Sequence, residues 1–361
     1  MHIGVDGNEA NVEYKVGVSW YVYKLLQQFA KTASAENSYT VFLRENPKRD
    51  LPKQNKFFHY AVVPGKIAWS QLFLPFALYI RYRSIDIFFS PAHYTPRFCP
   101  VPIVVTLHDL SYFYYPNDFY RRDLLKLEHW TRYSVQHAAK IIAVSDRTKR
   151  DALAQYGLRT DAVLVIPNGF EPPSQKPILT SVTSPYFVYV GTLQPRKNIE
   201  TLLYAFADVH EKYPSYCLRI VGKKGWMYER IFTLVESLKL TNYVTFTGYV
   251  DEKEKYSIIT NATALVLPGL YEGFGLPMLE AFYTRVPVVA AYAGALPEIG
   301  EDAVLYTKSV DHVDLSLKMI EVIEKKDAEA RTKRAYLLVK KYSWERTAHQ
   351  ILDVLKKVYS S

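Results

Sequence analysis

Short, almost continuous apolar runs alternate with longer stretches of helical periodicity along the first half of the chain. The apolar runs predict strands at His2–Gly7, Tyr39–Leu43, Phe57–Val63, Ile85–Ser90, Ile103–Leu107, Ile141–Ser145 and Val163–Pro167. Helical patterns lie between them, for example at Ser19–Ala33 and Arg122–Ala139. Several runs consist mainly of Val, Ile and Phe, as is typical of parallel strands that helices cover on both faces.

The second half repeats this plan. Strands are predicted at Tyr186–Val190, Cys217–Val221, Val244–Thr247, Ala264–Leu267, Val286–Ala290 and Ala303–Tyr306. Helices are predicted at Ile199–Lys212, Tyr228–Leu238, Lys253–Asn261, Met278–Tyr283 and Val313–Lys325. The alternation of strands and helices in both halves predicts an α/β protein with two doubly wound sheets.

A segment without a clear period, rich in Pro, Ser and Thr, separates the halves at 168–185. At 361 residues, the chain is also too long for one ordinary core. We therefore predict an N-terminal domain over 1–172 and a C-terminal domain over 173–343, with a last helix within about 344–361 that packs back on the first domain. In such sheets, ligands bind beyond the carboxyl ends of the strands.

The composition, 49% hydrophobic and 22% charged, is that of a soluble globular protein. The opening Met-His-Ile-Gly-Val-Asp fits a buried strand better than a secretory signal, and no run reaches the roughly 20 apolar residues that span a bilayer. Cys99 and Cys217 lie far apart in apolar stretches, which argues against a disulfide framework or a zinc site. We therefore expect a cytoplasmic protein.

The net charge is +9, from 45 Lys and Arg against 36 Asp and Glu. Residues 1–172 hold 21 of the basic and 15 of the acidic residues, so the excess there is +6 and the remainder carries +3. Such charges usually form a solvated face, and an anionic surface is the alternative partner. No nucleic-acid-binding motif accompanies the charge, so we do not expect a nucleic-acid partner.

Tyr271–Glu280 holds the most informative cluster of chemistry, because two carboxylates, Glu272 and Glu280, bracket a glycine-rich turn. Pro277 suits the first position of a helix, so Glu272 is expected in a loop and Glu280 one turn inside that helix. The glycines allow a close approach of backbone to a ligand, and the N–H groups at the helix start favour an anion or a polyol oxygen. The alternative is an ordinary strand–loop–helix connection with surface glutamates.

A second cluster follows the strand Tyr186–Val190. Gly191 ends the strand, Asn198 is predicted to cap the next helix, and Arg196 and Lys197 stand just before that helix begins. Two cations beside exposed N–H groups would make a cradle for a diphosphate. Two solvated basic residues in a loop are the alternative.

Three further positions lie at predicted strand ends or helix starts. Gly222 directly follows a strand and either admits a ligand or forms a surface turn. His108, followed by Asp109, could bond a sugar hydroxyl, act as a base, ligate a metal or serve a structural role. Gly17 stands at the head of the first predicted helix.

Some motifs are missing from the sequence. The first strand is not followed by Gly-x-Gly-x-x-Gly, and there is no Walker loop, which disfavours dinucleotide binding and P-loop chemistry. There is also no Asp-x-Asp that would hold Mg²⁺ or Mn²⁺ on a diphosphate. We therefore expect neither a metal nor a cofactor, and assign the neutralisation of a diphosphate to Arg196, Lys197 and helix N-termini.

These elements in this order resemble the retaining family-4 glycosyltransferases of GT-B fold, and the resemblance spans the chain. Glu272–Glu280 is similar to the family's Glu-x7-Glu hallmark, and Gly191–Asn198 to its diphosphate motif. Further similar segments are His108–Asp109, Ile166–Gly169 and Tyr342–Glu345. The resemblance implies two Rossmann-like domains that face each other across a cleft, the first for the acceptor and the second for the nucleotide-sugar donor.

Within the family, Gly191–Asn198, Gly222–Trp226 and Leu296–Glu298 look most like the mannosyltransferase-B-like subgroup that builds O-antigen polysaccharide. That implies transfer of a hexose, best mannose from GDP-mannose, to a saccharide or lipid-linked saccharide acceptor in surface polysaccharide synthesis. A UDP-sugar donor, an epimerase or phosphorylase of the same fold, and a non-catalytic scaffold are the alternatives.

The resemblance also implies roles for single residues of the second half. Arg196 and Lys197 would hold the donor diphosphate, with Gly191 beside it, and Glu280 would bind the ribose hydroxyls. The transferred sugar would contact Glu272 and the backbone of Phe274, Gly275 and Leu276. The base would lie near Gly222 and the turn formed by Tyr249 and Val250.

In the first half, the resemblance implies that His108 contacts the sugar near the reacting carbon and that Gly17 offers an N–H to the diphosphate. The family's opening loop often carries paired glycines, whereas here only Gly17 is present, which weakens its assignment.

The segment Lys66–Arg81 mixes Trp and Leu with flanking charge. A core helix of the first domain is the favoured interpretation. The alternative is an interfacial helix that meets a lipid-linked acceptor, which would place the protein peripherally on the inner face of the cell membrane.

Overall fold

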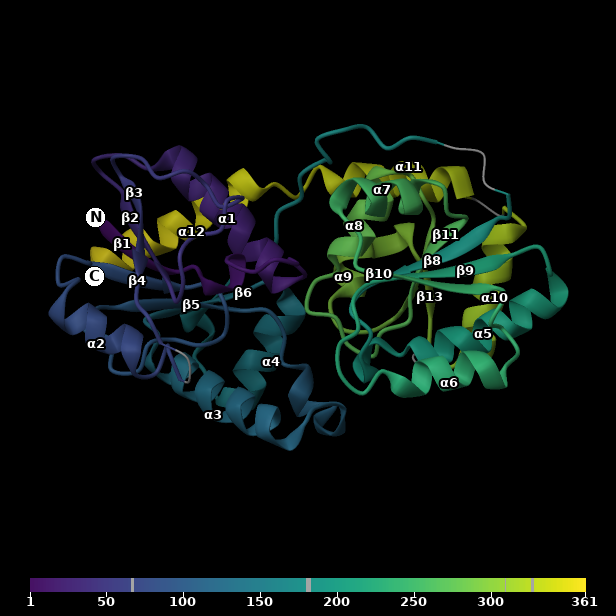
Figure 1. Ribbon diagram of the computed structural model, residues 1–361, viewed down its shortest axis with the longest axis horizontal. Coiled ribbons are helices and arrows are strands. Elements are labelled where there is room, and N and C mark those ends of the chain that lie inside the picture. The colour runs from purple at the N-terminus through teal and green to yellow at the C-terminus, as the bar shows by residue number, and fades with distance from the viewer. Residues whose placement is uncertain (66–67, 180–182, 309, 326–327) are drawn as a thin grey trace. The chain divides into compact units, whose positions relative to one another are not determined.

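The computed structural model describes residues 1–65, 68–179, 183–308, 310–325 and 328–361 (Figure 1). The chain divides into two compact units. Unit 1 comprises Met1–Tyr114, Phe119–Gly169 and Tyr342–Ser361, and unit 2 comprises Tyr115–Asp118 and Phe170–Lys341. The chain thus passes into unit 2 after Gly169 and returns after Lys341, close to the positions 172 and 343 expected from the sequence.

Unit 1 contains a seven-stranded parallel sheet in the order β3-β2-β1-β4-β5-β6-β7. Its strands are β1 (His2–Asp6), β2 (Ser38–Leu43), β3 (Phe58–Val62), β4 (Ile87–Ser90), β5 (Ile103–Leu107), β6 (Lys140–Ala143) and β7 (Val163–Val165). All seven were predicted, each to within two residues at either end. The order of the strands reverses between β1 and β4, which makes their carboxyl ends the expected place for a ligand.

The α-helices described in unit 1 are α1 (Val18–Thr32), α2 (Phe73–Ile80), α3 (Arg121–His137), α4 (Asp146–Tyr156) and α12 (Trp344–Tyr359). The sequence analysis missed α4, a largely polar helix that buries few side chains. It is nevertheless well delimited. The Ser145 side chain accepts from the backbone N–H of Thr148, and Gly157 ends the helix in the left-handed conformation.

The last helix, α12, packs against α1 inside unit 1. Thr347 Oγ1 donates to the Pro167 carbonyl at 2.8 Å, and the Trp344 ring meets Tyr21 edge-on at 5.8 Å. A Cβ atom at Gly169 would lie 2.3 Å from the Trp344 nitrogen, so only glycine allows this approach. The segments Ile166–Gly169 and Tyr342–Glu345, both marked in the sequence, therefore form the contact that attaches α12 to unit 1.

Unit 2 contains a six-stranded parallel sheet in the order β10-β9-β8-β11-β12-β13. Its strands are β8 (Tyr186–Val190), β9 (Cys217–Val221), β10 (Val244–Gly248), β11 (Ala264–Leu267), β12 (Val288–Ala291) and β13 (Leu305–Thr307). Its described α-helices are α5 (Ile199–Lys212), α6 (Glu229–Ser237), α7 (Glu252–Thr260), α8 (Leu276–Tyr283), α9 (Leu296–Gly300), α10 (His312–Ile323) and α11 (Ala328–Val339). Both units are thus Rossmann-like, as predicted, although α9 and α11 were not.

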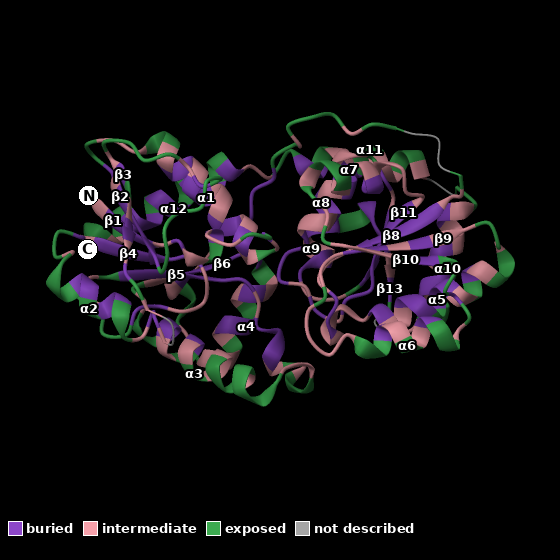
Figure 2. Cartoon of the chain, in the orientation of Figure 1, coloured by how far each residue is buried: buried purple, intermediate pink, exposed green. Residues whose placement is uncertain are grey.

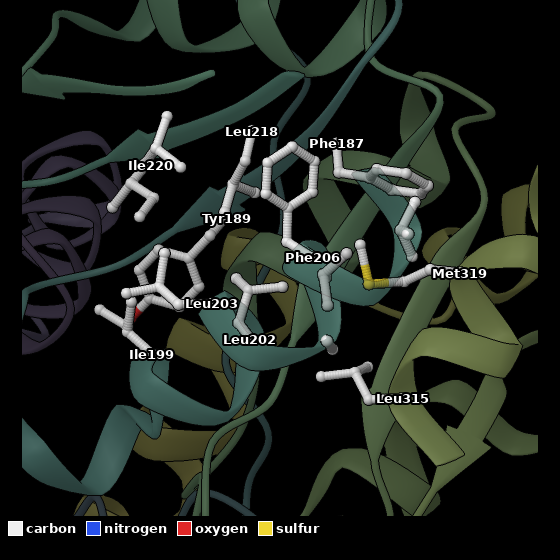
Figure 3. Packing of buried hydrophobic residues seen from close by; sticks show 14 of the residues in the cluster. Phe187, Tyr189, Ile199, Leu202, Leu203, Phe206, Leu218, Ile220, Leu315 and Met319 are labelled. Carbon is white, nitrogen blue, oxygen red and sulfur yellow. The ribbon is translucent and has the colours of Figure 1, made fainter. Parts of the chain in front are cut away.

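In both units the strands are largely buried and most of the helices expose one face (Figure 2). In unit 2, fully buried Phe187 of β8 packs with Leu202 and Phe206 of α5 and Met319 of α10 (Figure 3). This core fixes β8 and the start of α5, from which the candidate site projects.

Within the part of the chain that the structure describes, none of the helices combines the length and hydrophobicity needed to cross a bilayer. Cys99 and Cys217 are both free thiols.

Candidate functional site

Arg196, Lys197 and Glu272 come together where the strand order of unit 2 reverses between β8 and β11. The loops that follow these two strands are bonded to each other. Asn198 Nδ2 donates to the Pro268 carbonyl at 3.1 Å, and the Leu270 N–H donates to the Arg196 carbonyl at 2.9 Å. The short 3₁₀ helix Pro195–Lys197 is thereby held beside Glu272.

Asn198 occupies the N-cap position of α5, as predicted, but it does not cap the helix through a backbone N–H. Its backbone is left-handed, with φ of 53°, and its side chain makes no capping bond. The amide nitrogen donates to the Pro268 carbonyl, and the amide oxygen accepts from Thr201 Oγ1 at 2.7 Å. The side chain thus joins the loop after β11 to the first turn of α5.

The Arg196 guanidinium is fixed by neighbouring groups of the same unit. Its Nη1 donates to the Tyr271 carbonyl at 3.1 Å. In the amide orientation that satisfies both groups, the Gln194 side-chain oxygen accepts from Nε at 3.1 Å and from Nη2 at 3.3 Å. Buried Gln194 was not noticed in the sequence, because nothing local distinguishes it from a loop residue. It holds the cation in one orientation.

Lys197 and Glu272 form an ion pair in which the ammonium contacts both carboxylate oxygens. The Lys197 ammonium lies 2.6 Å from Oε1 and 2.7 Å from Oε2 of Glu272, and both side chains are 15% exposed. The sequence analysis assigned Lys197 to the diphosphate and Glu272 to the transferred sugar, and it did not predict that the two residues pair. In the structure the positive charge of Lys197 is balanced by the carboxylate of Glu272.

A second ion pair joins Lys255 of α7 to Glu280 of α8. The Lys255 ammonium lies 2.6 Å from Glu280 Oε1, and the two side chains are 17% and 13% exposed. Burial raises the pKa of Glu280, while the positive charge of Lys255 acts in the opposite direction. Glu280 Oε2 is buried and has no hydrogen-bond partner within the described structure, so it is an acceptor available to a hydroxyl.

Lys255 was missed by the sequence analysis. It lies on a helix together with exposed Lys253 and Glu254, where a lysine is usually solvated. Only the packing of α7 against α8 brings it to Glu280.

The Glu272 backbone is held from a third loop. The Ala295 N–H donates to the Glu272 carbonyl at 2.8 Å, and a Cβ atom at Gly294 would lie 2.3 Å from that carbonyl oxygen. The sequence analysis noted the neighbouring Leu296–Glu298 but not Gly294. Because only glycine allows so close a contact at position 294, this loop packs directly on the Glu272 backbone and helps to hold it in place.

Helix α8 begins at Leu276, one residue earlier than Pro277 suggested. Gly275 precedes it with φ of 115°, a conformation that side chains rarely adopt. The backbone N–H groups of the first turn of a helix have no partner within the helix. Phe274, Gly275 and Leu276 therefore lie at a helix start that favours negative charge or hydroxyl oxygens.

Gly222 allows the loops that follow β8 and β9 to pack closely. Its φ is 150°, and a Cβ atom there would lie 1.9 Å from the Gly191 carbonyl oxygen. Its N–H donates to the Gly248 carbonyl at 3.0 Å. The ends of β8, β9 and β10 are thus tied side by side, and the turn of Tyr249 and Val250 follows at the same edge.

In unit 1, His108 follows β5 and is only 8% exposed. Its Nε2 donates to the Pro91 carbonyl at 2.7 Å, and its ring meets the edge of Tyr21 at 4.7 Å. Burial, assisted by neighbouring His93, lowers the pKa of His108 to about 3. The imidazole is therefore neutral near pH 7, and Nδ1 is the nitrogen left to accept a hydrogen bond.

Gly17 precedes α1 with φ of 45°, and a Cβ atom there would meet nothing within 4 Å. Glycine at this position serves the backbone conformation and not packing. Gly17 and His108 belong to unit 1, and the other predicted site residues belong to unit 2. Among the described residues, no three His, Cys, Asp or Glu side chains gather as a metal site.

Comparison with protein families gives one match for each half of the chain. Residues 16–172 match the model described as Glycosyltransferase Family 4, and residues 172–337 match that described as Glycosyl transferases group 1. The two models meet at the boundary between the halves.

O-antigen chain mannosyltransferase B of Escherichia coli is 29% identical over 340 residues, which cover 90% of this chain and 84% of that protein. Among solved structures, sucrose-phosphate synthase from Thermosynechococcus elongatus aligns with a TM-score of 0.80 at 20% identity, over 100% of this chain and 99% of the other. HepE of Anabaena, in complex with UDP and glucose, aligns with a TM-score of 0.75 at 18% identity, over 98% and 99%. At these identities the structural likenesses show the fold alone.

Proposed function

Because the chain belongs to the glycosyltransferases of family 4 and group 1, we propose that it transfers a hexose from a nucleotide sugar to a saccharide acceptor. Its two Rossmann-like units are those of the GT-B fold. The observation that carries the proposal is the set of fixed charges at the ends of β8 and β11. Arg196, Lys197 and Glu272 meet there, on loops that are bonded to each other.

The donor we favour is GDP-mannose, and the product a surface polysaccharide built on a saccharide or lipid-linked saccharide acceptor. The similarity to an O-antigen chain mannosyltransferase supports this choice. A UDP-sugar is the alternative donor, since the structurally similar HepE was solved with UDP and glucose.

In the proposed reaction, the bond between the anomeric carbon and the β-phosphate oxygen breaks, and the bond to the acceptor oxygen forms on the same face. Negative charge then develops on the leaving diphosphate, where Arg196 and Lys197 stabilise it without a metal ion. The departing phosphate takes the proton of the acceptor hydroxyl. Because the acceptor bonds to the face that the phosphate leaves, the configuration at the sugar is retained.

The carboxylates have separate positioning roles in this proposal. Glu272, which is bonded to Lys197, orients hydroxyls of the transferred sugar, together with the backbone at the start of α8. Glu280 accepts a hydrogen bond from a ribose hydroxyl through Oε2. Neutral His108 accepts a hydrogen bond from a sugar hydroxyl at Nδ1. It does not act as a general acid, because its pKa lies near 3.

The test is sugar transfer and nucleotide binding by Arg196→Ala and Lys197→Ala, with exposed Arg230→Ala of α6 as the control. Each site variant is expected to lose at least a hundredfold in transfer, as is typical when a fixed charge-stabilising group is removed. Thermal unfolding checks that Lys197→Ala, which leaves Glu272 without this partner, is still folded.

Near-normal transfer by both variants would contradict the site assignment. Conversion of a nucleotide sugar to its epimer in the absence of acceptor would favour the epimerase alternative instead.

A further inference from the structure

Helix α2 has an apolar side chain at every position except for the hydroxyl of Tyr79. Its inner face, with Leu74, Ala77 and Leu78, packs in a core cluster of unit 1. Its outer face is exposed, together with Leu72 just before the helix. The exposed fractions of Leu72, Phe73, Phe76, Tyr79 and Ile80 are 64%, 43%, 68%, 48% and 53%. A helix that is apolar all round is normally covered on both sides.

The loop that precedes Cys99 extends this exposed surface. Gln71 Nε2 donates to the Thr95 carbonyl at 3.1 Å, and the Arg97 N–H donates to the Ser70 carbonyl at 3.3 Å. These bonds hold the loop beside the start of α2, and its Phe98 side chain is 70% exposed. We call Leu72, Phe73, Phe76, Tyr79, Ile80 and Phe98 together the α2 face. So many neighbouring exposed large apolar side chains are unusual on a monomer and mark an interaction surface.

Exposed basic residues stand at both ends of the α2 face. Arg97 lies in the loop that is bonded to the start of the helix, where its N–H donates to the Ser70 carbonyl. Arg81 and Arg83 are exposed directly after the last turn of α2. The surface is therefore apolar at its centre and cationic at its rim.

We propose that the α2 face docks on a bilayer that contains anionic phospholipids. The apolar side chains enter the interface between headgroups and acyl chains, and the arginines contact lipid phosphates. A second copy of the chain fits the surface less well, because pairing two α2 faces would bring two cationic rims together.

The structure changes which residues carry this docking. Lys66 and Ile67, the start of the segment noted in the sequence, lie outside the described residues. Trp69 does not reach the surface, since it is 1% exposed and its Nε1 donates to the Val63 carbonyl at 2.6 Å. Membrane contact falls instead to the outer face of α2 and to Phe98, while the inner face remains core.

The first experiment is flotation of the full chain with vesicles of phosphatidylcholine alone or mixed with phosphatidylglycerol. The unaltered protein is expected to bind the mixed vesicles. The double variant Leu72→Ser with Phe76→Ser is expected to bind at least tenfold more weakly, because two large side chains no longer leave water. The control is Val313→Ser with Leu317→Ser on α10, side chains of matched exposure at 53% and 58%.

The second experiment reverses the rim charge by Arg81→Glu with Arg83→Glu. Affinity for the mixed vesicles is expected to fall about fivefold or more for each arginine, and the preference for phosphatidylglycerol to weaken. Lys239→Glu with Lys253→Glu, two exposed lysines of unit 2, changes the net charge equally and is expected to leave binding in place.

Three outcomes would overturn the proposal. They are failure of the unaltered protein to float, equal binding by the serine variant and its control, and a dimer in sedimentation that the serine variant abolishes. None of these readouts uses sugar transfer, so the proposal stands or falls independently of the proposed activity.

Discussion

At the scale of single residues, the two ion pairs differ in what they leave for a ligand. Lys197 engages both oxygens of Glu272, whereas Lys255 engages only Oε1 of Glu280. A buried acceptor without a partner costs stability, and a ligand that satisfies it recovers that cost. Under the proposed function, Lys255 is a positioning residue, because it fixes the carboxylate of Glu280 with Oε2 left as the acceptor for a ribose hydroxyl.

Lys255→Met is therefore expected to weaken the contribution of the ribose hydroxyls to nucleotide binding. Calorimetry compares a nucleoside diphosphate with its 2′,3′-dideoxy analogue. The unaltered protein is expected to bind the analogue about tenfold more weakly, corresponding to one lost hydrogen bond to a charged group. In the variant, this difference is expected to shrink toward none. Lys253→Met, an exposed neighbour on α7, is the control.

A variant that loses affinity for both nucleotides equally would show that Lys255 only supports the packing of α7 on α8. Rescue of the difference by Lys255→Arg would support positioning by charge.

His108 gives a prediction about stability and pH. Its folded pKa, about 3, lies below the ordinary value of 6.5 for the unfolded chain, because burial disfavours the charged form. Below pH 6.5 the unfolded state therefore binds a proton that the folded state does not, and stability falls as the pH falls. Between pH 7 and pH 5, the free energy of unfolding is expected to fall by about 2 kcal/mol.

Urea unfolding of unit 1 at the two pH values checks this result. The unaltered protein is expected to lose about 2 kcal/mol more than His108→Asn over this range. Equal losses in the two proteins would show that His108 titrates normally.

At the scale of elements, the strands were predictable because each is a short apolar run that burial on both faces requires. Helices α4 and α11 were missed, since each buries only three side chains and lacks a clear apolar period. The positions of the loops were predictable, but their contacts with each other were not. Gly222 was expected to admit a ligand or to form a surface turn, and its close contact with the Gly191 carbonyl was not foreseen.

Gly222→Ala is therefore expected to destabilise unit 2 by about 3 kcal/mol or more, since a methyl group would overlap a backbone oxygen that cannot move freely. Gly248→Ala is the matched control on the same sheet edge. There φ is 72° and nothing lies within 4 Å of the added atom, so only conformational strain of about 1–2 kcal/mol is expected.

Equilibrium denaturation of unit 2, followed by hydrogen exchange, measures both variants. Equal stability of the two would mean that the loops after β8 and β9 separate easily.

At the scale of the whole molecule, Arg196, Lys197 and Glu272 could be placed together from sequence, because carboxyl ends of neighbouring parallel strands share one edge of a sheet. Lys255 and Gln194 could not, since the first depends on how two helices pack and the second on the path of a loop. The attachment of the last helix to the first unit was also expected. Only the structure shows that it depends on Gly169, where the absence of a side chain allows Trp344 to approach.

Removal of residues 342–361 is expected to destabilise unit 1 by about 5 kcal/mol or more while leaving unit 2 unchanged. The deletion removes the buried side chains of Trp344, Ile351 and Leu355 and exposes the surface of unit 1 that α12 covers. Calorimetry with hydrogen exchange assigns the transitions to the units. Replacing exposed Lys356 and Lys357 by Ala in the full chain is the control and is expected to move neither transition.

If the deletion lowered both transitions equally, the two units would unfold as one cooperative body.

The attachment of α12 to unit 1 has a consequence for protein synthesis. Unit 1 begins at the N-terminus, yet its last helix is translated only after Phe170–Lys341. At about 5–20 residues per second, the ribosome needs roughly ten to thirty seconds to make that intervening stretch. During this time unit 2 can complete its sheet, whereas unit 1 waits with the apolar side of α1 exposed to chaperones. The unit that is translated first is therefore the last to be finished.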